Sequence, residues 1–278
     1  MDLRNVLKQF NIRPKKSLGQ NFIFDQAVLD RIVAAGDVSP QDTVLEIGPG
    51  AGSLTRRLAE TAARVVAVEL DDRLIPVLQH TLAEYSNVTV VQGDILTVQL
   101  PTSKLQTPNT YKVVANIPYY LTSALIRHLL EADARPSLMV LTVQREVAER
   151  ICAAPPDMSL LAVSVQFYGR PRLMGQIPAR AFHPAPDVDS AIVRIDLFDQ
   201  PPLVGAEADK FFRLAKAGLG QKRKQLKNAL KAGLGLRGEG AVSLLNAAGI
   251  DPMRRAETLT MEEWMKLFKM PAFRRTPH

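Results

Sequence analysis

One stretch of the sequence, TVLEIGPGAGSL at residues 43–54, constrains the fold more than any other. Its first part is apolar and rich in β-branched residues, which is typical of a buried parallel strand. The GPGAG segment that follows predicts a sharp turn, and residues 53–62 have the spacing of a helix. A strand, a glycine-rich turn and a helix form the opening of a nucleotide-binding βαβ unit.

Two kinds of ligand fit such a turn. A dinucleotide favours the spacing G-x-G-x-x-G, whereas this chain has G-x-G-x-G and no P-loop lysine. S-adenosylmethionine carries a sulfonium and an ammonium group, which favour carboxylates near the turn. Glu69 and Asp94 stand at the ends of the next two predicted strands, near 65–70 and 88–93, and Glu69 has the spacing of a ribose-holding acid. Asp94 is then free for the adenine amino group. The alternative is an ordinary turn with solvated acids, and three strand ends in register disfavour it.

Length and composition predict one full α/β domain and a smaller second domain. The chain has 278 residues, of which 46% are hydrophobic, and no apolar run approaches the roughly 18 residues of a membrane span. Its first residues lack the apolar core of a signal peptide. Cys152 is the single cysteine, and the four histidines have no metal-ligand spacing. We therefore expect a cytoplasmic protein that binds neither a membrane nor a metal.

The positive charge of the chain is concentrated near its C-terminus. Residues 1–200 hold 20 Lys and Arg against 21 Asp and Glu, whereas residues 201–278 hold 15 against 7. The second segment includes a basic stretch with helical spacing at residues 222–231. A solvated helix face is the ordinary explanation of such a stretch. Because residues 1–200 are nearly neutral, the concentration of positive charge in residues 201–278 favours contact with a polyanion such as nucleic acid.

The remaining pattern alternates strands and helices, and residues 101–110 are predicted to form a surface loop. We predict strands near residues 43–48, 65–70, 88–93, 111–117, 137–143, 171–177 and 190–197, and helices near 53–62, 72–84, 122–132, 144–153 and 158–168. An N-terminal basic arm, residues 13–23, precedes them. Its spacing by itself predicts a solvated linker.

The end of the fourth predicted strand carries the residues suited to chemistry on an amine. Asn116 can accept one hydrogen of an exocyclic amine through its carboxamide oxygen, and Pro118 fixes the backbone so that a nearby carbonyl can accept the other. Tyr119 offers a ring on which a base can stack. Such binding suits methylation of adenine N6. A strand-ending turn with one exposed tyrosine is the alternative, and the preceding glycine turn disfavours it.

Several motifs occur together and in a fixed order from residue 15 to near the C-terminus. They are KKSLGQNFIFD, VLEIGPGAGSLT, VVAVELD, VVQGDIL, VVANIPYYLTS, VQREVAERI, AFHPAPDVDSAIVR, GQKRKQLKNAL and RRAETLTMEEW. With these motifs the chain resembles the KsgA family of small-subunit ribosomal RNA adenine dimethyltransferases, which are relatives of the Erm methyltransferases. The resemblance implies a Rossmann-like class I methyltransferase with a seven-stranded, mostly parallel sheet and a small C-terminal α-helical domain. The implied domains are residues 1–200, with an arm at 1–24, and residues 201–278.

The resemblance also implies roles for individual residues. Those that would bind S-adenosylmethionine are Gln20, Asn21, Ile23, Gly48, Gly50, Glu69, Leu70, Asp94, Ile95 and Asn116. Those that would hold the target adenine are Asn116, Pro118, Tyr119 and Phe182, and those that would contact RNA are Lys15, Lys16, Lys222, Arg223, Lys224 and Lys227. This implication replaces the linker interpretation of the arm. For Phe182, a core position after a strand remains the alternative, and His183 has no assigned role.

The implied reaction is direct transfer of a methyl group to N6 of two neighbouring adenosines in the 3′-terminal hairpin of 16S rRNA. The implied partner is the small ribosomal subunit, and a monomer is expected. An Erm-like enzyme acting on large-subunit rRNA is a second interpretation, and the long C-terminal segment disfavours it. A non-catalytic assembly factor is a third, and the presence of Asn116, Tyr119 and the glycines disfavours it. A DNA adenine methyltransferase fits the turn but not the C-terminal motifs.

Overall fold

The computed structural model describes residues 2–98, 111–221 and 223–274, and the predicted loop at 101–110 lies outside them. The chain divides into two compact units. The first consists of Met1–Ala148 and Arg170–Asp199, and the second of Glu149–Gly169 and Gln200–His278. The predicted boundary at residue 200 is where the chain enters the second unit for the last time. Residues 149–169, which the sequence placed in the first domain, belong to the second unit.

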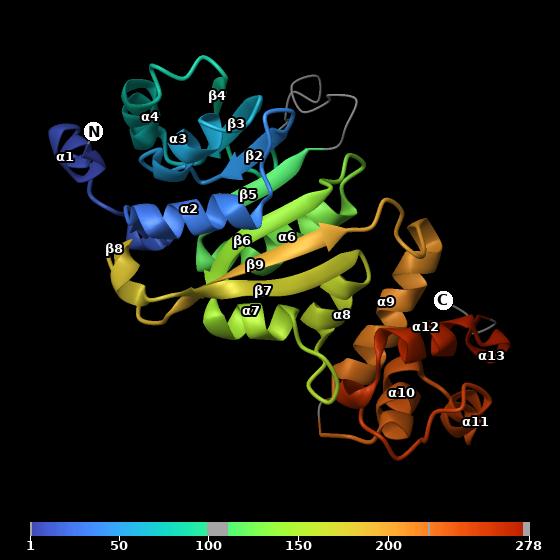
Figure 1. Ribbon diagram of the computed structural model, residues 1–278. Coiled ribbons are helices and arrows are strands. Elements are labelled where there is room, and N and C mark those ends of the chain that lie inside the picture. Colours follow the sequence, from blue (N-terminus) through green and yellow to red (C-terminus); the bar gives the residue numbers. More distant parts are fainter. Residues whose placement is uncertain (1, 99–110, 222, 275–278) are drawn as a thin grey trace. The chain divides into compact units, whose positions relative to one another are not determined.

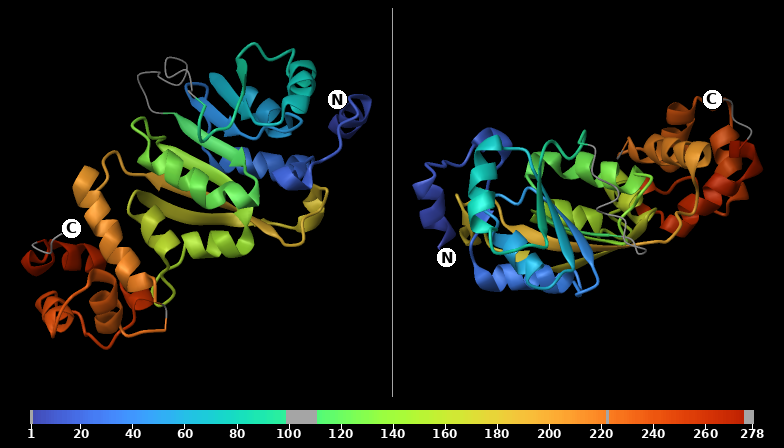
Figure 2. Two further views of the ribbon diagram at one scale, coloured as in Figure 1. Left: turned by 180° about the vertical axis from the view of Figure 1, so that it is seen from behind. Right: turned by 90° about the horizontal axis from the view of Figure 1, so that it is seen from above.

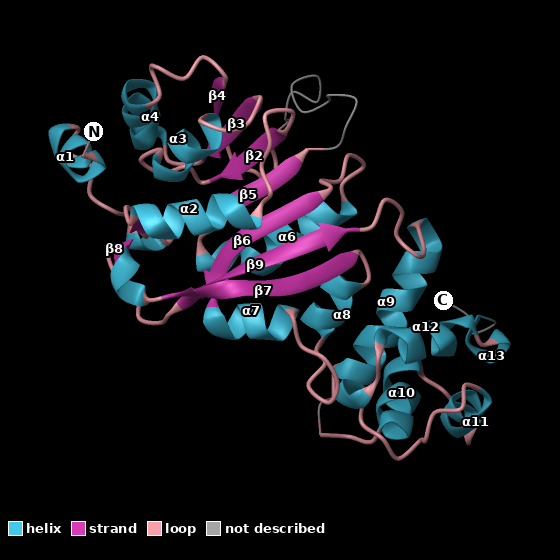
Figure 3. Cartoon of the chain, in the orientation of Figure 1, coloured by secondary structure: helices cyan, strands magenta, loops and turns pink. Residues whose placement is uncertain are grey.

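A seven-stranded sheet forms the centre of the first unit (Figures 1 and 3), in the order β4-β3-β2-β5-β6-β9-β7. The strands are β2 (Thr43–Ile47), β3 (Arg64–Glu69), β4 (Val88–Gln92), β5 (Lys112–Asn116), β6 (Leu138–Gln144), β7 (Gly169–Ile177) and β9 (Ser190–Leu197). The strands from β4 to β6 pair in parallel, and β9 is antiparallel to β6. All seven predicted strands are confirmed. The chain runs outward from β2 to β4 and returns to β5, so the strand order reverses between β2 and β5.

Helices cover both faces of this sheet. The helices that lie wholly or partly in the first unit are α1 (Leu3–Gln9), α2 (Gln26–Ala35), α3 (Ser53–Ala59), α4 (Ile75–Thr81), α6 (Thr122–Glu131) and α7 (Arg145–Ile151), of which α1 packs against α4. α2 and α3 lie on one face, and α6 lies on the opposite face, which the left panel of Figure 2 shows. The helix predicted at 72–84 is divided, because Asp71 caps a 3₁₀ turn, η2 (Asp72–Leu74), before α4 begins with a proline in its first turn.

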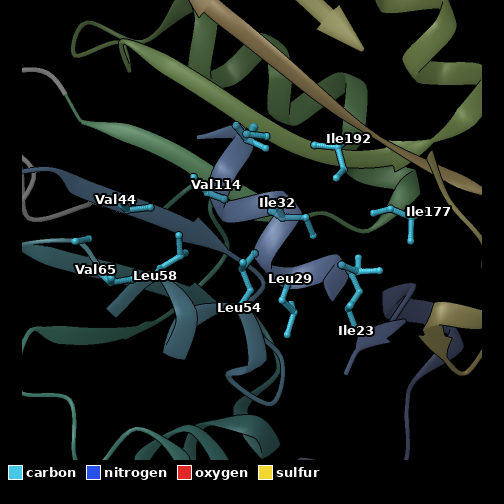
Figure 4. Close-up of a cluster of buried hydrophobic side chains, with 14 of the residues drawn as sticks. Ile23, Leu29, Ile32, Val44, Leu54, Leu58, Val65, Val114, Ile177 and Ile192 are labelled. Atoms are coloured by element: carbon cyan, nitrogen blue, oxygen red, sulfur yellow. The ribbon is translucent and has the colours of Figure 1, made fainter. Parts of the chain in front are cut away.

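The core between the sheet and α2 and α3 is built from aliphatic side chains (Figure 4). The strands contribute Val44, Val65, Val114 and Ile192, and the two helices contribute Leu29, Ile32, Leu54 and Leu58. Burial of each such side chain contributes about 1.5–3 kcal/mol. This packing fixes the carboxyl ends of the central strands relative to the start of α3.

A two-stranded antiparallel sheet joins the N-terminal arm to a later segment. β1 (Phe22–Ile23) pairs with β8 (Phe182–His183), and the 3₁₀ turns η1 (Lys16–Leu18) and η4 (Ala179–Ala181) precede these two strands. The solvated linker that spacing alone predicted for the arm is therefore wrong. The apolar side chains of Phe22 and Ile23 are buried, and alternation over two residues is too short a pattern to reveal this from the sequence.

The second unit is helical in its described residues, as Figure 3 shows. It contains α8 (Leu160–Gln166), α9 (Gly205–Leu219), α10 (Leu226–Leu234), α11 (Gly240–Ala247), η5 (Ala256–Thr258), α12 (Met261–Lys269) and α13 (Pro271–Arg274). Trp264 and Phe268 of α12 are buried, as is Phe211 of α9, and Phe167 stacks on Phe211 with ring centroids 4.9 Å apart. None of the described helices is long and apolar enough to cross a membrane.

Candidate active site

A pocket opens at the carboxyl ends of β2, β3, β4 and β5, where the strand order reverses. In open α/β sheets this is the usual position of a ligand site. The predicted cofactor and target-base residues all line the pocket. They are Gln20, Asn21, Ile23, Gly48, Gly50, Glu69, Leu70, Asp94, Ile95, Asn116, Pro118, Tyr119 and Phe182. The structure thus brings these residues together, and their individual roles remain predictions.

The glycine turn after β2 forms one wall of the pocket. Gly48 and Gly50 have φ angles of +68° and +60°, a conformation that glycine adopts without steric cost. A Cβ atom on Gly48 would meet nothing closer than the carbonyl oxygen of Asn116 at 4.0 Å, so open space adjoins this residue. A Cβ atom on Gly50 would instead lie 2.8 Å from the Phe22 ring. The arm and the turn are therefore in close contact.

Three carboxyl groups line the pocket, and no Lys, Arg or His belongs to its described lining. Glu69 is buried and accepts hydrogen bonds from the backbone N–H groups of Gly50 at 3.1 Å and Asp71 at 2.8 Å. Burial raises the pKa of Glu69, and these N–H donors oppose the rise. Asp94 is half-buried, and its Oδ1 accepts the backbone N–H of Leu96 at 3.0 Å.

Glu46, the charge within the β2 run, is the third carboxyl group. It is 1% exposed, and its Oε2 has no hydrogen-bond partner in the structure. Burial raises the pKa of Glu46 to about 8, with a further contribution from the charge of Glu69 and an opposing one from Thr55. A lining with carboxyl groups and without Lys, Arg or His suits a cationic ligand better than a pyrophosphate, which would find no positively charged partner there.

The predicted target-base residues lie beside the acids. Asn116 ends β5, and its Nδ2 donates a hydrogen bond to the carbonyl oxygen of Asn21 at 3.0 Å. The carboxamide oxygen is the atom that this bond does not use. Tyr119 and Ser190 share a hydrogen bond of 2.6 Å between their hydroxyl groups, which fixes the tyrosine ring. Phe182 is 5% exposed and belongs to the aliphatic core, yet it also lines the pocket.

Comparison with known proteins assigns this arrangement to a family. A family model described as ribosomal RNA adenine dimethylase matches residues 11–272. The chain belongs to the ribosomal RNA adenine dimethylase family. The predicted family and enzyme class, an rRNA adenine dimethyltransferase, are confirmed by this match.

Relatives of this adenine dimethylase family member are similar along nearly the whole chain. The ribosomal RNA small subunit methyltransferase A of Dehalococcoides mccartyi is 47% identical over 264 residues, which cover 95% of this chain and 90% of the relative. The protein of the same name from Alkaliphilus metalliredigens is 42% identical, and the match covers 97% of this chain and 96% of the relative.

Two solved structures support the predicted Rossmann-like fold of this dimethylase family member. A dimethyladenosine transferase from Plasmodium falciparum has a TM-score of 0.78 and 26% identity, with 88% of this chain and 95% of that chain covered. The 23S rRNA methyltransferase ErmE has a TM-score of 0.73 and 29% identity, and the match covers 90% of this chain and 98% of that chain. The predicted seven-stranded, mostly parallel fold with a helical C-terminal part is confirmed.

The predicted RNA-contacting residues of this family member fall into two groups. Lys15 and Lys16 lie in the arm, where the Lys15 ammonium is 3.5 Å from the Asp71 carboxylate. Arg223, Lys224 and Lys227 precede or begin α10 of the second unit, and the first two are exposed. The Lys227 ammonium lies 3.2 Å from the sulfur of Met253. Lys222 lies outside the described residues.

Two residues of the site were missed by reasoning from the sequence. Glu46 was visible as the single charge within an apolar strand, a pattern that indicates a buried carboxyl group. Asp71 does not line the pocket, but its buried carboxylate accepts a hydrogen bond from Gln20 of the arm at 2.8 Å. The Arg73 guanidinium beside Asp71 holds the pKa of this carboxyl well below its usual range. No sequence spacing indicated that contact.

The pocket fits S-adenosylmethionine by the criteria that the structure supplies. It has an unpartnered buried carboxyl oxygen on Glu46, open space beside Gly48 and an entirely acidic set of ionisable lining residues in its described part. Among the described residues, no group of three or more His, Cys, Asp or Glu could hold a metal ion.

Proposed function

We propose that this chain is an S-adenosylmethionine-dependent enzyme that dimethylates N6 of two adjacent adenosines in the 3′-terminal hairpin of 16S rRNA. The observation that carries the proposal is a pocket lined by carboxyl groups together with Asn116 and Tyr119. Family membership supports the reaction class, and relatives named for the small ribosomal subunit support the substrate. The proposal places the reaction in the cytoplasm, with a monomer acting on the subunit during its assembly.

The cofactor would be held by the turn and the strand ends. Gly48 and Gly50 would adjoin its methionine part, Glu69 would accept from the ribose hydroxyls and Asp94 from the adenine amino group. The remaining contacts would come from Gln20, Asn21, Ile23, Leu70 and Ile95. Bound there, S-adenosylmethionine would supply a methyl group on a positively charged sulfur.

The chain's own residues would position the target amine. Asn116 has its Nδ2 engaged by the arm, so its Oδ1 is available to accept an N6 hydrogen of adenine. The Tyr119 ring, fixed by Ser190, would stack on the base, an interaction worth about 1–3 kcal/mol, and Phe182 would contact it as well. Pro118 would hold the intervening backbone. The target base would have to be unstacked to reach this site.

Catalysis would then rest mainly on positioning. Alignment of two reactants in a near-attack geometry can contribute roughly 7–11 kcal/mol. A covalent enzyme intermediate is not required for this transfer. Cys152 does not suit such a role, because burial raises the pKa of its thiol to about 11 and keeps it protonated.

Binding of the RNA would involve the basic residues of both units. Arg223, Lys224 and Lys227, with Lys15 and Lys16 of the arm, would contact phosphates. The sequence prediction includes Lys222 in this set. About six phosphate contacts would lower the affinity around a thousandfold between 50 and 200 mM salt.

The proposal is tested by methyl transfer from labelled S-adenosylmethionine to purified, undermethylated small and large ribosomal subunits. The expected product after digestion is N6,N6-dimethyladenosine, found only with small subunits. Label on large-subunit RNA would instead support the Erm-like function, which the likeness to ErmE favours. Tight binding without transfer to either subunit would refute the enzymatic proposal.

A variant of the proposed amine-binding residue sharpens this test. We expect Asn116→Ala to abolish transfer and to leave subunit binding largely intact, because the change removes the amine acceptor but none of the basic residues. The matched control is Asn5→Ala, the same substitution at an exposed position of α1 outside the pocket. Turnover of Asn116→Ala at the wild-type rate would refute the assigned role.

A further inference from the structure

Within the arm, the segment of residues 15–23 closes part of the pocket but has little secondary structure of its own. It consists of the 3₁₀ turn η1 and the two-residue strand β1, and its residues from Leu18 onward line the pocket. β1 is joined to β8 at only two register positions. Tertiary contacts must therefore supply much of what holds the arm in this position.

One carboxylate supplies several of these contacts. The Asp71 side chain has no exposed surface, and its oxygens accept from Gln20 Nε2 at 2.8 Å, Arg73 Nη2 at 2.6 Å and Arg73 Nε at 2.9 Å. The Lys15 ammonium lies 3.5 Å from the same carboxylate. Arg73 in turn donates from Nη1 to the carbonyl oxygen of Arg13 at 3.4 Å. Asp71 thus contacts both ends of the segment from Lys15 to Gln20.

Both polar atoms of the Gln20 side chain take part in this arrangement. Its Oε1 accepts the backbone N–H of Lys15 at 2.8 Å, while its Nε2 donates to Asp71. The next residue, Asn21, presents its carbonyl oxygen to Nδ2 of Asn116. A continuous set of contacts therefore runs from Asp71 at the end of β3 through the arm to Asn116 at the end of β5.

We propose that Asp71 is a positioning residue that holds the arm closed over the pocket and, through Asn21, sets the orientation of the Asn116 carboxamide. A bond from Nδ2 to the arm leaves Oδ1 as the atom available to a target amine, and a 180° rotation of the amide would reverse these roles. The part that concerns Asn116 rests on the proposed function. The part that concerns closure of the arm does not.

The test uses Asp71→Asn in the full-length protein, a change that keeps the size of the side chain and one acceptor oxygen. We expect the dissociation constant for S-adenosylhomocysteine, measured by calorimetry, to rise about tenfold or more, in line with loss of a charge-assisted contact. We also expect faster tryptic cleavage after Lys15 and Lys16, detected by mass spectrometry. S-adenosylhomocysteine should protect these bonds in the wild-type protein and protect them less in the variant.

The control is Asp196→Asn, the same substitution at a carboxylate bound by Arg172 and Arg194, none of which lines the pocket. It should change neither the cofactor-analogue affinity nor cleavage of the arm. A second variant, Gln20→Ala, completes a double-mutant cycle with Asp71→Asn. Because the two residues share the hydrogen bond from Gln20 to Asp71, we expect the double variant to be less impaired than the product of the two single effects.

Three outcomes would overturn the proposal. If Asp71 served only to cap η2, thermal stability would fall while analogue affinity and arm cleavage stayed at wild-type values. Independent, multiplicative effects in the double-mutant cycle would refute the contact with Gln20 as the means of closure. Transfer by Asp71→Asn at the wild-type kcat with saturating cofactor would refute the link to Asn116. Analogue binding and proteolysis need no RNA, so these results are independent of which ribosomal subunit is the substrate.

Discussion

Replacement of Glu46 by Gln tests how burial affects the ionisation of one carboxyl group that lines the pocket. Glu46 is 1% exposed, and its pKa is raised from 4.5 to about 8, with burial as the largest cause. In the unfolded chain the same group titrates near its ordinary value. Between these two values the folded protein therefore keeps a proton that the unfolded chain has lost.

The sign and size of the effect follow from this difference. Because the folded state binds more protons than the unfolded state, the free energy of unfolding falls as pH rises from about 4.5 to about 8. Each unit of pH in this window costs about 1.4 kcal/mol. Between pH 5.5 and 7.5 the contribution of Glu46 should fall by roughly 2.5 kcal/mol. A glutamine at this position would be neutral throughout and would make no such contribution.

The assay is urea denaturation followed by circular dichroism at several pH values for the wild-type protein and Glu46→Gln. The difference between the two free energies of unfolding removes the contribution of the titrating groups that do not interact with Glu46. The variant should gain stability relative to the wild type as pH rises from 5.5 to 7.5. A difference that stays constant over this range would refute a buried, proton-retaining Glu46.

Three other changes have defined outcomes. Gly50→Ala places a side chain at φ +60° and 2.8 Å from the Phe22 ring, so the free energy of unfolding should fall by roughly 2–4 kcal/mol and S-adenosylhomocysteine should bind more weakly by calorimetry. Tyr119→Phe loses only the hydrogen bond to Ser190 and should lower kcat/KM less than tenfold. Tyr119→Ala also loses the stacking surface, which should raise the activation free energy by roughly a further 1–3 kcal/mol. Equal losses in the two variants would contradict a stacking role. Lys224→Ala should reduce the slope of log K against log salt for subunit binding by about one, and an unchanged slope would exclude a phosphate contact there.

Much of the site was predictable because its residues follow strands. The apolar run before the glycine turn predicted β2, and the acids Glu69 and Asp94 lie at the ends of β3 and β4, the next two strands on one side of it. The carboxyl ends of parallel strands share one edge of a sheet, so residues at those ends meet even when they are distant in sequence. The same argument brought Asn116 to this edge.

Boundaries that depend on distant packing were less predictable. The segment of residues 149–169 belongs to the second unit because Phe167 packs on aromatic rings of α9, such as Phe211. Nothing in the local spacing of α8 distinguishes this partner from the central sheet. The split between η2 and α4 is local by contrast, and the capping Asp71 and the following proline account for it.

The sequence by itself determined the order of strands and helices, the glycine turn and the set of acids and amides at the strand ends, because periodicity and local turn chemistry encode them. Only the tertiary structure decided how the arm closes and which carboxyl groups keep a proton. Closure depends on Phe22 pairing with His183 and on Gln20 reaching Asp71, contacts between segments far apart in the chain. The protonation of Glu46 depends on the removal of water by packing from several elements, which no spacing along one strand can express.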